Sequence, residues 1–361
     1  MKIAFDHQIF AAQEFGGVSR YFARLAGNLD ASRIDIGIFA PFHANAYLGE
    51  LRPGLVHGRQ LANRTQVGRA YNAINRALVP LLLARNKPDI VHETYYAERR
   101  LAPRRARVVL TVYDMIHEKF AAEFGPDDPT VARKRAAIAR ADHIVCISES
   151  TRRDLIAAYP DAAPRTSVTL LGFDPAPTLI DEDHKSGRPY LLFVGRRGGY
   201  KNFAGLLAAY AGSPSLRAGF DLVAVGGGSF GKAEWQAIES QGLAGAVRQV
   251  AAEEAALHGW YRGAAAFVYP SLYEGFGIPP LEAMAAGAPV VAMRVSSIPE
   301  VCGDAAAYAD GDVESLRSAI EAVVGSPVAA DALRTAGTAR LKQFSWQKCA
   351  VETAAIYRSL A

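Results

Sequence analysis

The sequence contains few cysteines, and no two of them stand at a metal-binding spacing. Cys146, Cys302 and Cys349 are the only three in 361 residues, and they lie far apart. An odd number of widely spaced cysteines is typical of a reducing compartment and argues against a disulfide framework or a structural zinc site. We therefore expect a cytoplasmic protein.

Long uncharged apolar runs are also missing. The longest apolar segments, such as residues 77–84, are interrupted by Arg or Pro, whereas a membrane-spanning helix needs about 20 apolar residues in succession. The first residues, MKIAFDHQIF, lack the basic start, the longer apolar run and the small-residue cleavage site of a signal peptide. The sequence thus predicts a protein without a transmembrane helix.

Neither sign of charge dominates, but positive charge gathers in the first half. Residues 1–180 hold 24 Lys or Arg against 18 Asp or Glu, and the remainder holds 16 against 18. Clusters of basic residues usually form a solvated face, although they can also attract an anionic membrane or a phosphate-bearing acceptor. No aromatic residues are interleaved with it, so nucleic acid is not an expected partner. The basic clusters are Arg99, Arg100, Arg104, Arg105 and Arg107, and Arg133, Lys134, Arg135 and Arg140.

Short β-rich apolar runs alternate with amphipathic helical stretches along the whole chain. This rhythm predicts an α/β fold with two doubly wound, Rossmann-like parallel sheets. Open parallel sheets bind ligands beyond the carboxyl ends of their strands, so the two domains are expected to face a central cleft. The expected strands are Lys2–Phe5, Asp35–Phe39, Ile90–His92, Val108–Val112, His143–Ile147, Ser167–Leu171, Tyr190–Val194, Asp221–Val225, Val247–Val250, Ala266–Tyr269 and Val290–Ala292.

A Pro-, Gly- and charge-rich segment, residues 172–189, is expected to link the two domains. We expect an N-terminal domain at 1–175, a C-terminal domain at 176–345 and a final helix at 346–361. Half of the residues are apolar, which suffices for a full core in each domain.

The segment 271–291, SLYEGFGIPPLEAMAAGAPVV, carries the most informative pattern. Glu274 follows a strand, Gly275-Phe276-Gly277 comes next, and a helix that starts near Pro280 contains Glu282. Glycines allow backbone N–H groups to approach a ligand closely, and a helix N-terminus attracts phosphate. The two carboxylates can then hold different parts of a ligand, Glu274 a sugar ring and Glu282 ribose hydroxyls. The alternative without a ligand is that Glu282 only caps or solvates its helix and that Glu274 is a residue of a surface loop.

This segment is very similar to the E-G-F-G-x-P-x-x-E-A-M-A-x-G-x-P-V-V signature of retaining glycosyltransferases of family 4, which have the GT-B fold. The resemblance extends over nearly the whole chain. Glu93–Tyr96 and Val112–Met115 resemble the branch that builds bacterial O-antigens and exopolysaccharides. Further matching segments are residues 15–22 (FGGVSRYF), 144–151 (IVCISEST), 193–202 (FVGRRGGYKN) and 297–301 (SIPEV).

The resemblance implies transfer of a hexose or deoxyhexose from a nucleotide sugar with retention at the anomeric carbon. The expected donor is a GDP-sugar such as GDP-mannose, and a UDP-sugar is the second choice. The expected acceptor is a saccharide, free or linked to a polyprenyl diphosphate. A lipid-linked acceptor would fit the basic first domain, and it would fit a peripheral contact of the protein with the inner face of the cytoplasmic membrane. The family also implies that the final helix crosses back to the N-terminal domain.

The resemblance also assigns the diphosphate site. One arginine and Lys201 are the implied ligands, with Arg197 preferred and Arg196 as the alternative. Their charge would stabilise the leaving diphosphate in place of a metal, so no metal and no other cofactor is expected. Gly17, with Gly16, lies between the first strand and the first helix, where helix N–H groups can face the donor or the acceptor. A tight turn without a ligand is the alternative there.

The acceptor side departs from the family pattern. Many members carry a His after the strand that matches residues 108–112, where this sequence has Tyr113 followed by Asp114. We expect Asp114 to act beside Glu274 as a catalytic residue, with His117 as a further candidate.

Two motifs are set aside. G-G-G-S-F-G at 226–231 matches GxGxxG but opens the wrong βα unit for a dinucleotide, so its glycines are expected to approach the donor. Asp181-Glu182-Asp183 matches the D-x-D of metal-dependent sugar transferases but falls in the expected linker.

Two other functions stay open: a nucleotide-sugar epimerase of the same architecture, and a non-catalytic nucleotide-sugar-binding partner.

Overall fold

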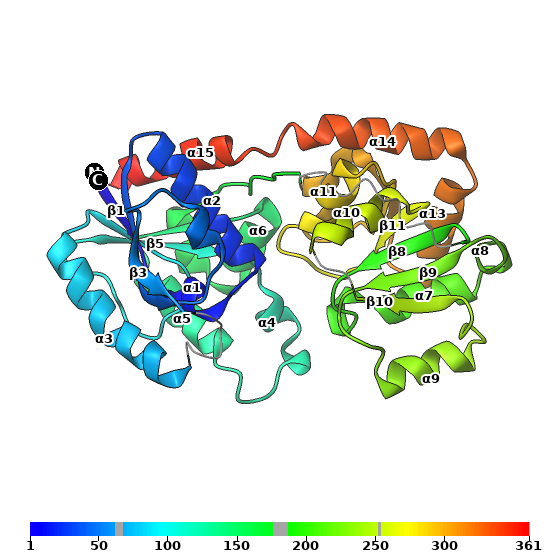
Figure 1. Cartoon of the computed structure of the whole chain (residues 1–361), viewed down its shortest axis with the longest axis horizontal. Helices are drawn as coiled ribbons and strands as arrows, with labels where there is room; N and C mark the ends of the chain where they lie inside the picture. Colours follow the sequence, from blue (N-terminus) through cyan, green and yellow to red (C-terminus); the bar gives the residue numbers. More distant parts are fainter. Residues whose placement is uncertain (62–67, 176–186, 252–253, 361) are drawn as a thin grey trace. The chain divides into compact units, whose positions relative to one another are not determined.

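The computed structural model describes residues 1–61, 68–175, 187–251 and 254–360, and the chain divides into two compact units (Figure 1). Unit 1 holds Met1–Gly172 together with Phe344–Ala361, and unit 2 holds Phe173–Gln343. Each unit is built on one parallel sheet with helices packed around it, which confirms the predicted α/β class with two doubly wound sheets. The D-x-D match at 181–183 and most of the expected linker lie outside the described residues.

Unit 1 contains a seven-stranded sheet in the order β3-β2-β1-β4-β5-β6-β7. The chain runs outward from β1 to β3 and then returns to β4 on the other side of β1, so the strand order reverses between β1 and β4. At such a switch point a crevice opens beyond the carboxyl ends of the strands. The strands are β1 (Lys2–Phe5), β2 (Asp35–His43), β3 (Val56–Gln60), β4 (Ile90–Glu93), β5 (Arg107–Val112), β6 (His143–Cys146) and β7 (Thr166–Val168).

Helices of unit 1 connect these strands, and local signals fix their ends. The hydroxyl of Ser148, for example, accepts the N–H of Thr151 at 3.0 Å and so caps the helix that follows β6. The helices are α1 (Gln8–Ala12), α2 (Gly17–Ala31), α3 (Arg69–Asn86), α4 (Ile116–Lys119), α5 (Thr130–Arg140), α6 (Glu149–Ala158) and α15 (Trp346–Leu360), with 3-10 turns η1 (Tyr47–Glu50), η3 (Ala121–Glu123) and η4 (Pro160–Arg165).

The last helix, α15, packs along α2 in unit 1 (Figure 1). The hydroxyl of its Tyr357 lies 2.6 Å from Nδ1 of His92 on β4, and Nε2 of His92 lies 2.8 Å from Oγ1 of Thr111 on β5. Burial lowers the pKa of His92 to about 3, so the imidazole is neutral at ordinary pH. These contacts tie the end of the chain to the centre of the sheet.

Unit 2 contains a six-stranded sheet in the order β10-β9-β8-β11-β12-β13, and its strand order reverses between β8 and β11. Buried apolar side chains such as Phe193, Leu222 and Val268 form the core with the surrounding helices. The strands are β8 (Tyr190–Val194), β9 (Asp221–Val225), β10 (Val247–Val250), β11 (Ala266–Tyr269), β12 (Val290–Met293) and β13 (Ala306–Ala309). The helices are α7 (Phe203–Ala211), α8 (Pro214–Gly219), α9 (Lys232–Ser240), α10 (Glu254–Arg262), α11 (Ile278–Ala285), α12 (Ile298–Cys302), α13 (Val313–Val324) and α14 (Pro327–Leu341), with 3-10 turns η5 (Gly199–Lys201) and η6 (Gly303–Ala305).

The structure differs from the predicted elements in a few places. No strand was expected at the positions of β3 and β13. The strand expected at Ser167–Leu171 is the shorter β7, because its only neighbour β6 ends at Cys146, which pairs with Val168.

Candidate active site

Lys201 and Glu274 meet at the switch point of unit 2, where β8 and β11 are neighbours. Lys201 ends the turn η5 after β8, and Glu274 lies in the loop after β11. Nζ of Lys201 is 2.7 Å from Oε1 of Glu274, and the two side chains are 21% and 10% exposed. Two residues that the sequence assigns to the donor site are therefore adjacent, at the edge of the sheet where ligands bind.

Two serines after β12 hold the backbone of the Glu274 loop. The N–H of Glu274 donates to Oγ of Ser296 at 2.9 Å. Oγ of Ser297 lies 2.8 Å from the carbonyl oxygens of both Glu274 and Phe276, and Ser297 is fully buried. Sequence reasoning gave these serines no role, although Ser297 begins the matching SIPEV segment. Their contacts fix the position of the glutamate before any ligand arrives.

Two buried tyrosines accompany the two glutamates. The hydroxyl of Tyr261 on α10 donates to Oε2 of Glu282 on α11 at 3.0 Å. Tyr269, at the end of β11, lies beside Glu274. Burial, and then the neighbouring carboxylate, raises the pKa of each tyrosine well above its ordinary value, so both stay protonated donors. Neither was expected from the sequence, because a buried aromatic residue at a strand or helix end resembles ordinary core.

The turn between Glu274 and α11 needs its glycine. Gly277 has φ of +118°, a conformation that side chains disfavour, and Phe276 is buried. Pro279 and Pro280 lie in the first turn of α11 and have no N–H to offer. The N-terminus of this helix therefore has fewer free donors for a phosphate than most helices, which places more of that task on the neighbouring loop and Lys201.

Arg197 faces a loop of its own unit. Its Nε donates to Oε1 of Glu234 on α9 at 2.6 Å. Its terminal nitrogens donate to the carbonyls of Gly226 at 2.7 Å and Ser229 at 3.1 Å. The side chain is 4% exposed, so little of the guanidinium is left for a diphosphate. Arg196 is exposed, and it makes no hydrogen bond or ion pair with another described residue.

The loop after β9 that holds this guanidinium begins with three glycines. Gly226, Gly227 and Gly228 all have φ between +71° and +87°. A Cβ at Gly227 would lie 2.7 Å from Nη1 of Arg197. The G-G-G-S-F-G segment is therefore explained by the path of this loop, and its conformation requires no dinucleotide.

Asp114 lies beyond the carboxyl end of β5 in unit 1. Its Oδ1 accepts the N–H of Ile116 at 3.0 Å, and its carbonyl accepts from Nζ of Lys134 at 3.0 Å. Lys134 is 1% exposed and also donates to Glu118 at 2.8 Å. The buried ammonium fixes the loop that carries Asp114.

The residues on either side of Asp114 are held by unit 1 itself. Tyr113, at the position where many family members have His, is buried and donates to the carbonyl of Thr94 at 3.2 Å. The ring of His117 stacks on Phe124 with a centroid distance of 3.9 Å, and its Nε2 is 3.6 Å from Oδ2 of Asp128.

Gly17 is the first residue of α2, and Gly16 is its N-cap. A Cβ on Gly17 would meet no atom within 4 Å, whereas one on Gly16 would lie 2.3 Å from Oε1 of Gln13. That oxygen accepts the N–H of Ser19 at 3.1 Å and so holds the entry to the helix. The loop therefore leaves space beside Gly17, as a ligand at this helix N-terminus would require.

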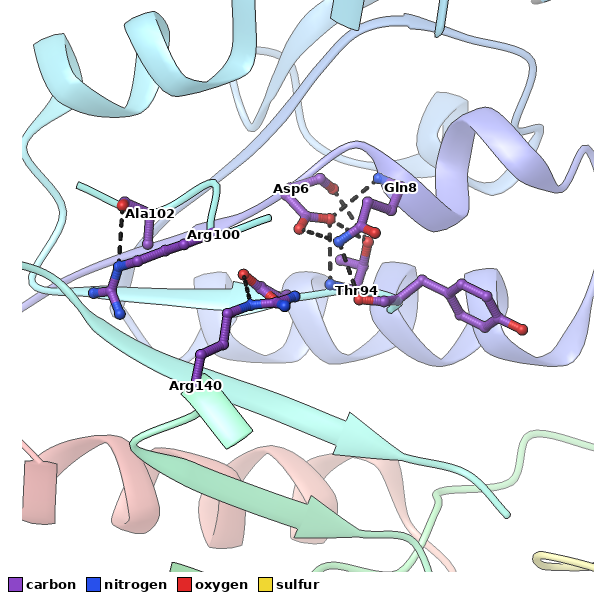
Figure 2. Close-up of polar contacts among 8 residues, drawn as sticks. Asp6, Gln8, Thr94, Arg100, Ala102 and Arg140 are labelled. Carbon is purple, nitrogen blue, oxygen red and sulfur yellow. Dashed lines mark hydrogen bonds and ion pairs between the residues drawn. The ribbon is translucent and has the colours of Figure 1, made fainter. Parts of the chain in front are cut away.

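Glu93, the last residue of β4, is fully buried and pairs with Arg140 of α5 (Figure 2). Nε of Arg140 is 3.2 Å from both carboxylate oxygens, and Nη2 is 2.5 Å from Oε2. Burial raises the pKa of Glu93, against the attraction of the guanidinium. Together with the burial of Lys134, this contact shows that the second basic cluster is only partly a solvated face.

Among the described residues, no group of three or more His, Cys, Asp and Glu side chains is arranged to hold a metal ion. No helix within the same ranges is long and apolar enough to cross a membrane. The three cysteines are buried free thiols, and burial raises the pKa of each to about 12.

Two family profiles match the chain in succession. The family described as Glycosyltransferase Family 4 matches residues 15–176, and the family described as Glycosyl transferases group 1 matches residues 179–340. The chain therefore belongs to the group 1 glycosyltransferases of family 4 and is a glycosyltransferase, as the resemblance in the sequence predicts.

Individual relatives agree with this assignment. The O-antigen chain mannosyltransferase B of Escherichia coli is 29% identical over 95% of this chain and 96% of its own length. Two solved structures share the fold at 19% identity. A sucrose-phosphate synthase from Thermosynechococcus elongatus has a TM-score of 0.73 over 99% of this chain and 98% of its own. An Anabaena protein, HepE, in complex with UDP and glucose has a TM-score of 0.72 over 99% of this chain and 100% of its own.

Proposed function

We propose that this glycosyltransferase transfers mannose or a related hexose or deoxyhexose to a saccharide during synthesis of an O-antigen or similar polysaccharide. The observation that carries the proposal is the match, over nearly the full length of both chains, to an O-antigen chain mannosyltransferase. The proposed donor is a GDP-sugar such as GDP-mannose, with a UDP-sugar as the alternative. The proposed acceptor is a saccharide, free or linked to a polyprenyl diphosphate.

In the proposed donor site, cations of unit 2 hold the diphosphate and carboxylates hold hydroxyl groups. Lys201 and the exposed Arg196 are the available cations, since Arg197 is already bonded to Glu234. Fixed positive charge at the leaving group stabilises the transition state without a metal. Glu274 would exchange its contact with Lys201 for sugar hydroxyls, and Glu282 would accept from the ribose.

The proposed reaction retains the configuration of the anomeric carbon. The bond from that carbon to the phosphate oxygen breaks, and the acceptor hydroxyl attacks from the same face. The leaving phosphate oxygen then takes the hydroxyl proton. On the acceptor side, Asp114 is the proposed polar contact, held in place by Lys134.

We also propose a peripheral contact of unit 1 with an anionic membrane surface. Arg99, Arg104 and Arg105 are exposed on the loop between β4 and β5. Clustered basic side chains are attracted to anionic lipid by about 1 kcal/mol each. Co-sedimentation with vesicles containing phosphatidylglycerol tests this contact. The wild-type protein should sediment with the vesicles, and the variant with all three arginines replaced by Ser should not.

A transfer assay tests the proposed function directly. The protein is incubated with GDP-mannose and octyl α-mannoside, with and without EDTA, and the new linkage is assigned by NMR. We expect an α-linked product whose rate of formation does not depend on EDTA. Interconversion of a free nucleotide sugar without an acceptor would point to an epimerase. Binding without turnover would point to a non-catalytic partner.

A further inference from the structure

Gln8 lies at the switch point of unit 1, where β1 and β4 are neighbours. It is the first residue of α1, directly after β1, and it is half-buried. Open parallel sheets bind ligands at this place in the fold. The equivalent place in unit 2 holds the Lys201–Glu274 pair. Nothing in the sequence pattern singled out Gln8.

Two oxygen acceptors use both hydrogens of the Gln8 side-chain amide (Figure 2). Nε2 donates to Oδ2 of Asp6 at 2.7 Å and to the carbonyl of Tyr95 at 3.0 Å. A carboxylate and a backbone carbonyl can only accept, so the nitrogen end of the amide must face them. The carbonyl oxygen Oε1 is thereby directed elsewhere, and the part of the chain that the structure describes gives it no partner.

Asp6 is a rigid support for this amide. Its carboxylate is fully buried and accepts from the hydroxyl of Thr94 at 2.5 Å, from the N–H of Thr94 at 3.2 Å and from the N–H of Gln8 at 3.1 Å. A buried carboxylate with this many donors has little freedom to turn. Because Asp6 follows β1 and Thr94 follows β4, the same contacts join the two loops that border the switch point.

We propose that Gln8 binds the acceptor saccharide by accepting a hydrogen bond from one of its hydroxyl groups through Oε1. This inference rests on the proposed function, because it assigns the ligand of unit 1 to a saccharide. A carbonyl oxygen beside a buried carboxylate repels an anion and needs a hydrogen-bond donor, and hydroxyl groups are the donors that a saccharide offers. The amide is already ordered, so binding costs little further side-chain entropy.

Gln8→Met tests the proposal, since it keeps the length of the side chain and removes the amide. With GDP-mannose and octyl α-mannoside, we expect the KM for the mannoside to rise about five-fold, the usual effect of one lost hydrogen bond. The KM for GDP-mannose and the thermal shift that it produces should stay unchanged. Gln241→Met, at the half-buried glutamine that follows α9, is the control.

Monodeoxy analogues of octyl α-mannoside that keep the reacting hydroxyl give a second measurement, which uses the wild-type protein. One analogue should be about five-fold poorer for the wild type but no poorer for Gln8→Met, because the two changes remove the same hydrogen bond. Equal KM values for Gln8→Met and wild type, or a matching rise in the KM for GDP-mannose, would overturn the inference and leave the proposed function standing. Failure of the wild type to bind or use any nucleotide sugar would instead overturn the proposed function.

Discussion

Lys201 and Glu274 are separated by 73 positions in the chain, yet Nζ of one lies 2.7 Å from Oε1 of the other. The contact exists because the loops after β8 and β11 meet at the switch point of unit 2. In unit 1 the amide of Gln8 makes the corresponding contact to the carbonyl of Tyr95, across β1 and β4. Each unit thus presents polar side chains at the place where its topology opens a crevice.

Removal of the Lys201 ammonium should show how much the ion pair with Glu274 contributes to the free energy of unfolding. Lys201→Met leaves a carboxylate that is 10% exposed without its cation, and we expect a loss of about 1–3 kcal/mol in the free energy of unfolding. Combining it with Glu274→Gln should recover part of that stability but none of the transfer activity. Urea unfolding and initial rates measure the two effects. A double variant less stable than Lys201→Met would contradict this interpretation.

The two neighbouring arginines should separate stability from donor binding. Arg197→Ala removes the partner of Glu234 and of three carbonyls, so we expect it to cost about 2–3 kcal/mol in the free energy of unfolding. Arg196→Ala should change stability by less than about 0.5 kcal/mol, as exposed positions usually do. It should, however, raise the KM for the nucleotide sugar about ten-fold, since a charge-assisted hydrogen bond is lost. A raised KM for Arg197→Ala and an unchanged KM for Arg196→Ala would show that Arg197, and not Arg196, binds the diphosphate.

Ser297 should matter to activity more than to stability. Its hydroxyl contacts the carbonyls of Glu274 and Phe276, so Ser297→Ala frees the loop that carries the glutamate. We expect a loss of about 1 kcal/mol in stability and about a ten-fold loss in kcat/KM from the misplaced side chain. Ser326→Ala is a matched control, because that serine only caps α14. Equal kcat/KM values for the two variants would refute the assigned role of Ser297.

Acid should destabilise the protein through His92. The unfolded chain binds a proton at this residue below about pH 6.5, whereas the folded protein does so only near pH 3. Stability from the neutral imidazole is therefore complete above the unfolded pKa and is lost as the pH falls, by about 2 kcal/mol between pH 7 and pH 5. Burial also lowers the pKa values of His7, His43 and His143, which act in the same direction.

Urea unfolding at the two pH values, with His92→Gln alongside wild type, measures that contribution. The variant should be less stable at pH 7, because Tyr357 and Thr111 lose their partner, but it should lose less on acidification. If His92→Gln and wild type lose the same free energy of unfolding between pH 7 and pH 5, His92 does not supply the pH dependence.

The sequence predicted the strands that are buried on both faces. β1, β8, β9 and β11 have the predicted bounds, because central parallel strands are short apolar runs with turn residues at their ends. β3, with the sequence VHGRQ, is an edge strand with four of its five residues exposed, so it carries no hydrophobic pattern. β13, at the other edge, is AAYA, and alanine has little strand preference.

The site was predictable where one motif and the topology decide it. Lys201 and Glu274 each follow a predicted strand, and the carboxyl ends of parallel strands share one edge of a sheet. The direction of Arg197 was not predictable, because it depends on Glu234 on α9 and on the path of three glycines. Gln8 carries no local signal either, since its orientation is set by the backbone of Tyr95 across the sheet.

The thermal unfolding midpoint, measured against GDP-mannose, UDP-glucose and dTDP-glucose with and without EDTA, tests the donor site most directly. A ligand that binds only the folded protein raises the midpoint by mass action. We predict a rise with GDP-mannose that is unaffected by EDTA, absent in Glu282→Ala and kept in Glu239→Ala, a control on the exposed side of α9. No rise with any of the three nucleotide sugars would contradict the assignment of Lys201, Glu274 and Glu282 to a donor site.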